Sequence, residues 1–122
     1  MTEAIEMRED EMFPKMIDFL KSEGYKILEV HRGRERGADI VAEKFGRKLI
    51  IEMKGDTMAL SVDLGTAIWQ LMRYMKGPVE DYALAVTSSY KRYIKAVEYP
   101  LKQLDVKVFI VSEKGVSLFF KN

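Results

Sequence analysis

Two apolar segments joined by a short turn constrain the fold of this chain more than any other feature. The runs 38–43 (ADIVAE) and 48–53 (KLIIEM) have the residue types of β-strands, and the turn KFGR between them is typical of a hairpin. With Phe45-Gly46 as the two turn residues, the numbers of paired positions add up to 91, so Asp39 faces Glu52. Both faces of these strands carry apolar residues, which predicts a sheet covered by helices on each side.

The rest of the chain alternates between helix-like and strand-like segments. Helices show apolar residues at every third or fourth position, whereas strands show short apolar runs bounded by turn residues. The expected order is αβββαβαββ, a mixed α/β sheet in which 25–53 is an antiparallel meander and 82–111 a parallel crossover. The expected helices are a stripe from Met12 to Leu20 ending at Gly24, a segment from Asp63 as N-cap to Lys76, and a segment from Ser88-Ser89 to Pro100 or Leu104. The other expected strands are 25–31, 82–87, 106–111 and 116–120.

Composition excludes several kinds of site. The 122 residues suffice for one domain, and we treat 1–122 as a single domain. There is no cysteine and only one histidine, His31, so a disulfide framework, a thiolate site and a histidine-rich zinc centre are excluded. Any metal must therefore be held by oxygen atoms. No apolar run approaches the roughly 18–20 residues of a membrane span, and the first residues are acidic, so we expect a cytoplasmic protein without membrane contact.

The net charge of +1 hides a segregation of charge along the sequence. Residues 1–24 carry seven acidic and three basic side chains, a net charge of −4. Residues 31–54 carry seven basic and four acidic side chains, a net charge of +3, and residues 91–107 also sum to +3. Basic segments of this kind can follow a phosphate backbone, although a solvated mixed surface is the commoner explanation for any one of them.

The hairpin register places like charges together at the end of an apolar strand. Cross-strand partners have Cβ atoms roughly 4.5–5.5 Å apart, where two carboxylates repel, so Asp39 and Glu52 need a compensating charge. Lys54 lies two residues beyond Glu52 and therefore on the same face of the strand. A Mg²⁺ or Mn²⁺ ion would offset the repulsion, because hard divalent ions prefer oxygen ligands and keep waters for a phosphate substrate. The alternative is a structural cluster satisfied by Lys54 and Arg36, without metal.

A longer pattern links these residues to a known family. Gly37-Ala-Asp39 and Ile50-Ile-Glu52-Met-Lys54, with twelve residues between Asp39 and Glu52, together resemble the PD-(D/E)XK nuclease superfamily, whose restriction-endonuclease-like core has the order αβββαβ. Within it the chain looks like archaeal Holliday-junction-resolvase-type and Mrr-type nucleases, and Gln70-Leu-Met-Arg-Tyr74 matches the Q-x-x-x-Y helix motif of RecB-type nucleases. The resemblance covers roughly residues 10–112. It implies a Mg²⁺- or Mn²⁺-dependent endonuclease acting on DNA, of the resolvase or restriction type.

The resemblance also implies roles for single residues. Asp39 and Glu52 would bind the metal, and the backbone carbonyl of Met53 would join them. Lys54 would orient or deprotonate the attacking water and stabilise charge that develops on the phosphate. On the same resemblance, Gln70 and Tyr74 line the site or contact DNA. Apart from the resemblance, the clustering of basic residues in one loop and on one helix adds further expected DNA contacts, namely Arg32, Arg34, Arg36, Lys91 and Lys95.

The sequence departs from the family pattern at two positions. Family members often carry a further acidic residue on the first helix, but the aligned position here is Phe13. Glu9 or Glu11, which lie close by in the sequence, are the candidates to approach the metal instead. The proline of the motif is replaced by Ala38, which matters less because the aspartate is the ligand.

Two other function classes stay open at this point. A non-catalytic nucleic-acid-binding module that retains the nuclease fold would bind DNA in a salt-dependent way without divalent metal. An RNA-processing enzyme that uses general acid–base chemistry would be insensitive to a chelator. A domain of this size has little surface with which to grip a duplex or a junction, so we expect a homodimer or a partner protein. The residues do not distinguish a junction from a nick, a flap, a duplex end or a single strand.

Overall fold

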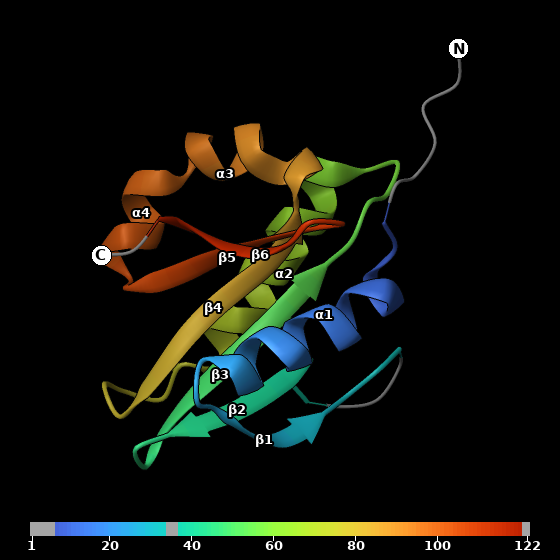
Figure 1. Ribbon diagram of the computed structural model, residues 1–122. Coiled ribbons are helices and arrows are strands. Elements are labelled where there is room, and N and C mark those ends of the chain that lie inside the picture. Colours follow the sequence, from blue (N-terminus) through green and yellow to red (C-terminus); the bar gives the residue numbers. More distant parts are fainter. Residues whose placement is uncertain (1–6, 34–36, 121–122) are drawn as a thin grey trace.

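The computed structural model describes residues 7–33 and 37–120, which form a mixed sheet with helices on both faces (Figure 1). Within these ranges six strands follow the order β1-β2-β3-β4-β5-β6 across the sheet. The α/β class expected from the sequence is confirmed. The strands are β1 (Lys26–Val30), β2 (Ile40–Lys44), β3 (Arg47–Lys54), β4 (Glu80–Thr87), β5 (Val106–Ser112) and β6 (Gly115–Phe120). The helices are α1 (Glu9–Ser22), α2 (Leu60–Tyr74), the 3-10 turn η1 (Ser88–Tyr90), α3 (Lys91–Ala96) and α4 (Glu98–Gln103).

Strand directions follow the order of elements along the chain. β1, β2 and β3 pair antiparallel, β3 pairs with β4 and β4 with β5 in parallel, and β6 returns antiparallel to β5. The parallel pairs have helical connections, because the chain must cross one face of the sheet before it starts the next strand in the same direction. The meander at 25–53 and the parallel step at 82–111 are therefore confirmed.

Two apolar layers hold the helices against the sheet. On one face, α1 buries Met12, Phe13 and Met16 in the same cluster as Ile51 and Met53 of β3. On the other face, α2, η1, α3 and α4 share a second cluster with the alternate residues of β3 and β4. Figure 1 shows α1 in front of the sheet and α2 behind it. Among the described residues, no helix is both long enough and apolar enough to cross a bilayer.

The β2–β3 hairpin has the register expected from its turn. Val41 pairs with Ile50, and every other pair between β2 and β3 keeps the same sum of residue numbers. Phe45 and Gly46 have φ angles of 54° and 77°, and positive φ at both central residues is the mark of a type I′ turn. The Phe45 side chain is 97% exposed, so its burial does not offset the strain of the left-handed backbone.

The prediction of one continuous third helix is wrong, because the structure has two short helices in that segment. α3 ends at Ala96, Val97 has a non-helical φ of −117°, and α4 begins at Glu98. Pro100 explains the break: it has no N–H to donate to the Ala96 carbonyl, and its ring would clash there in a continuous helix. In the first turn of α4 the missing N–H costs little, since that N–H has no intrahelical acceptor.

The start of the second helix also differs from the expectation. Asp63 is not the N-cap, because α2 begins at Leu60 and the capping position is Ala59. The Asp63 carboxylate accepts a hydrogen bond of 2.5 Å from the hydroxyl of Thr57. Asp63 thus lies inside the first turn, where a negative charge is still stabilised by the helix dipole.

The positive φ of Phe45 leads to a prediction about the stability of the fold. Phe45→Asn is expected to raise the free energy of unfolding by about 0.5–1 kcal/mol, because asparagine tolerates positive φ and little buried surface is lost. Urea unfolding monitored by circular dichroism measures the change. A variant of equal or lower stability would show that the exposed phenylalanine makes contacts that stabilise the fold.

Candidate active site

A polar cavity of about 460 Å³ opens where β3 ends. Its walls come from the start of α1, the loop that precedes β2, the end of β3, and the C-terminal half of α2. Segments far apart in the sequence therefore meet around one space. The lining residues are Glu9, Gly33, Gly37, Asp39, Glu52, Lys54, Gln70, Arg73 and Tyr74.

The hairpin brings the two predicted carboxylates together. Asp39 directly precedes β2, whose first residue Ile40 pairs with Ile51, and the same register continued by one step places Asp39 opposite Glu52. The two carboxyl groups are close enough to share a hydrogen bond. The backbone N–H of Met53 donates a second hydrogen bond, 2.7 Å long, to Oδ2 of Asp39. The juxtaposition expected from the sequence is therefore present.

The alternation of side chains along β3 determines which of its residues lie on the same face as Glu52. Met53 points into the apolar cluster under α1, so its neighbours Glu52 and Lys54 point to the α2 side. The charge of Lys54 lowers the pKa of both Asp39 and Glu52, although burial has the larger and opposite effect. The lysine thus lies within electrostatic range of both carboxylates, as expected.

Burial makes the carboxylate pair electrostatically unusual. Glu52 is only 4% exposed, and burial followed by the charge of Asp39 raises its pKa from 4.5 to about 8. Burial also raises the pKa of Asp39, but the hydrogen bond from Met53 favours its ionised form. Two adjacent carboxylates in such a place cannot both ionise easily, so Glu52 carries the proton at neutral pH.

The first helix contributes a third carboxylate, and it is Glu9 that lies at the cavity. Burial, then the charge of Asp39, raises the pKa of Glu9. Glu11 instead accepts a hydrogen bond of 3.2 Å from the backbone N–H of Arg8 at the start of α1, on the exposed side. Of the two alternatives left open by the sequence, the structure thus places Glu9 at the same cavity as the pair.

A glycine permits this approach of α1. A Cβ atom on Gly55 would lie 2.3 Å from the backbone nitrogen of Glu9, closer than any side chain can come. The adjoining residue Asp56 donates its N–H to the Met7 carbonyl at 2.7 Å, and its carboxylate accepts the Met7 N–H at 3.0 Å. The chain just after β3 therefore holds the chain just before α1 in place.

α2 supplies the opposite wall. Gln70 and Tyr74 are one turn apart and both line the cavity, as the helical spacing predicted. Burial, then the charge of Glu52, raises the pKa of the Tyr74 hydroxyl. Arg73 lines the cavity too and was missed in the sequence, although its place three residues after Gln70 is the signal that could have found it.

The predicted basic contacts with DNA are scattered. Arg32 does not line the cavity, and its guanidinium lies over the ring of Phe13 at 4.4 Å from the ring centroid. Lys91 and Lys95 are exposed on α3 and do not line the cavity either. Arg34 and Arg36 lie outside the described residues. None of the described basic residues in this set therefore lines the cavity.

The donor set fits a hard divalent ion that keeps much of its water. Within 7–33 and 37–120, no three histidine, cysteine, aspartate or glutamate side chains are close enough to hold one ion. Asp39 and Glu52 can offer two carboxylates, and Mg²⁺ is commonly held by one or two carboxylates with waters and substrate phosphates as its other ligands. A cation would also relieve the repulsion within the pair. The Met53 carbonyl as a further ligand stays a prediction.

The raised pKa of Glu52 predicts how stability depends on pH. Between 4.5 and about 8 the folded protein retains a proton that the unfolded chain releases, so the free energy of unfolding falls as the pH rises through this window. Glu52→Gln removes the titrating group, and the variant should be more stable than the wild type at pH 8 in EDTA.

Thermal unfolding at pH 5, 6.5 and 8 measures the effect. Glu43→Gln is the matched control, because it changes a carboxylate of β2 that does not line the cavity. Equal slopes of melting temperature against pH for the wild type and Glu52→Gln would contradict the proposed protonation of Glu52.

Comparisons with known proteins bear on the fold. No family model matches the sequence, and no curated protein matches it significantly. Among solved structures, the chain is similar to the crystal structure of an FdxN element excision controlling factor protein from Anabaena variabilis. The TM-score is 0.63 and the sequence identity 21%, over 91% of this chain and 99% of that chain. At this identity the likeness shows a shared fold alone.

Proposed function

We propose that this chain is a divalent-metal-dependent phosphodiesterase that cleaves DNA, a member of the PD-(D/E)XK superfamily with a restriction-endonuclease-like core. One observation carries the proposal: Asp39, Glu52 and Lys54 line one cavity with Gln70 and Tyr74. These are the residues that the resemblance selects from three separate segments of the sequence. The order α1, β1, β2, β3, α2, β4 is also the order of that core.

The chemistry of phosphodiester hydrolysis matches what these residues offer. A bound Mg²⁺ would polarise the phosphate and lower the pKa of a water molecule. The carboxylates of Asp39 and Glu52 would hold the ion at the end of a rigid strand. The ammonium group of Lys54 adds a positive charge in the same cavity, where it can orient the attacking water and stabilise charge on the phosphate oxygens. Gln70 and Tyr74 offer hydrogen-bond donors on the opposite wall.

The alternative of a purely structural ion cluster has less support. Such a cluster must be well paired to offset the cost of burial. In the described part of the chain, Lys54 forms no ion pair with Asp39 or Glu52. Arg36, the other expected partner, lies outside the described residues. The pair instead keeps a proton and faces an open cavity, which suits a site that takes up a cation.

The structural neighbour does not carry the proposal. That protein is described as a factor that controls excision of the FdxN element. Since the likeness shows only the fold, the proposal is based on the cavity and not on the neighbour.

The proposal predicts strand cleavage that needs both the metal and the cavity. The wild type is expected to cut labelled DNA with Mg²⁺ or Mn²⁺ and not with EDTA. The DNA panel contains a four-way junction, nicked and linear duplexes, a flap and a single strand. Asp39→Asn, Glu52→Ala and Lys54→Met should each lower the cleavage rate on the order of 10²–10³-fold, because each removes charge stabilisation from the reaction.

Controls separate loss of chemistry from loss of folding. Glu43→Gln alters a carboxylate outside the cavity and should cleave like the wild type. Thermal melts show whether each variant is folded. If no substrate is cut while DNA still binds in EDTA, the chain is a non-catalytic binding module and the proposal is wrong.

A further inference from the structure

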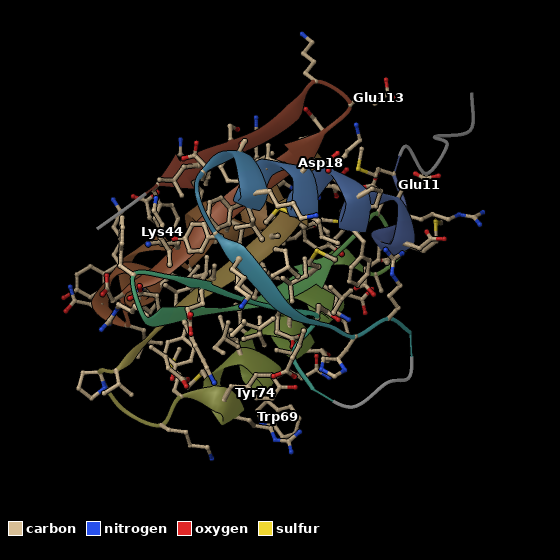
Figure 2. All side chains as sticks on the ribbon, turned by 60° about the horizontal axis from the view of Figure 1, so that its bottom comes forward. Glu11, Asp18, Lys44, Trp69, Tyr74 and Glu113 are labelled. Atoms are coloured by element: carbon tan, nitrogen blue, oxygen red, sulfur yellow. The ribbon has the colours of Figure 1, made fainter. Side chains whose placement is uncertain are left out.

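Trp69 is a large aromatic side chain that α2 leaves in solvent beside the cavity. It is the only tryptophan of the chain, and it is 59% exposed. It directly precedes Gln70, which lines the cavity, and Figure 2 shows it together with Tyr74 on the same part of α2. The buried face of this helix consists of Leu64, Ala67 and Leu71, so the core does not require Trp69.

An arginine connects Trp69 to the cavity. The Arg73 guanidinium lies over the indole ring, 4.9 Å from its centroid, and the same residue lines the cavity. Arg73 forms no ion pair with any residue that the structure describes, so its charge is available to an anion. In the same part of the chain, no other aromatic ring stacks on the indole. A flat apolar surface and an unpaired cation therefore adjoin one another at the edge of the site.

We propose that Trp69 and Arg73 form a platform for an unpaired nucleobase, with Trp69 stacking on the base and Arg73 contacting an adjacent phosphate. An indole can stack on any base, because every base has an exposed π-face once it leaves a helix. Inside a duplex both faces of a base are covered by its neighbours, and unstacking it costs free energy. This inference rests on the proposed function and deepens it: the preferred substrates are DNAs with an unpaired nucleotide beside the phosphate that is cut.

A second copy of this chain is the other occupant that the exposed face could accept, and the charge argues against it. Trp69, Met72 and Val62 are all exposed on α2, so an apolar contact between two such helices is conceivable. A two-fold contact centred on Trp69 would bring the Arg73 side chains of both copies close together, and like charges repel there. A nucleotide offers an aromatic face and a negative charge together, which is what the Trp69–Arg73 pair complements.

Intrinsic fluorescence tests the inference directly, because all indole emission comes from Trp69. The wild type is titrated in EDTA and in Mg²⁺ with a 12-nucleotide single strand, with a continuous duplex of the same sequence, and with that duplex carrying an unpaired flap. Saturable quenching is expected with the single strand and the flap, and little with the continuous duplex. Fluorescence anisotropy of labelled DNA reports binding independently.

Variants show whether the quenching reflects affinity. Trp69→Ala is expected to weaken binding of the single strand and the flap by roughly tenfold, while binding of the continuous duplex stays unchanged. Trp69→Phe should retain most of the affinity, since phenylalanine also stacks. Phe45→Ala is the matched control, an exposed aromatic at the hairpin turn that should leave binding unchanged.

The outcomes distinguish this inference from the proposed function. If DNA is cut but Trp69 neither quenches nor contributes to affinity, the platform is wrong and the nuclease stands. If Trp69 is quenched by single strands and no DNA is cut, the platform stands and the nuclease is wrong. Equal loss of duplex and single-strand affinity in Trp69→Ala, or a change of oligomeric mass in sedimentation, overturns the platform, and absence of any DNA binding overturns both.

Discussion

The pairing of buried Glu52 with half-buried Asp39 across the β2–β3 hairpin is the interaction on which the site depends. Asp39 and Glu52 are held side by side by a fixed strand register, and burial keeps a proton on Glu52. Such a pair destabilises the fold when both groups ionise, and the surrounding sheet has to hold it in place. The proton on Glu52 relieves this repulsion, and a divalent cation can take the place of that proton, so the geometry suits the proposed chemistry.

The other walls of the cavity follow from contacts made just beyond β3. Gly55 has no side chain, so α1 can begin against it and bring Glu9 to the cavity. The Gly55 carbonyl also accepts a hydrogen bond of 2.8 Å from the hydroxyl of buried Tyr90, which belongs to the opposite apolar layer. The segment after Lys54 is thus fixed from both faces of the sheet. We infer that these contacts at Gly55 maintain the shape of the cavity, although several acidic side chains lie close together in it.

Much of this arrangement could be predicted from the sequence, because it depends on short-range periodicity. The turn length sets the register of Asp39 and Glu52, and helical spacing brings Gln70 and Tyr74 to one side. The choice of Glu9 over Glu11 could not be predicted, since it depends on where α1 starts against Gly55. The break before α4 was also missed, although Pro100 was its visible cause.

Calorimetric titration of Mg²⁺ shows whether the carboxylate pair binds a divalent ion. Performed at pH 7 in two buffers of different ionisation enthalpy, it reports both metal binding and the protons released. Because Glu52 is protonated in the free protein, we expect release of about one proton per bound ion, and none with Glu52→Gln. Failure to bind Mg²⁺, or binding without proton release, would contradict the claim that the carboxylate pair is a metal site.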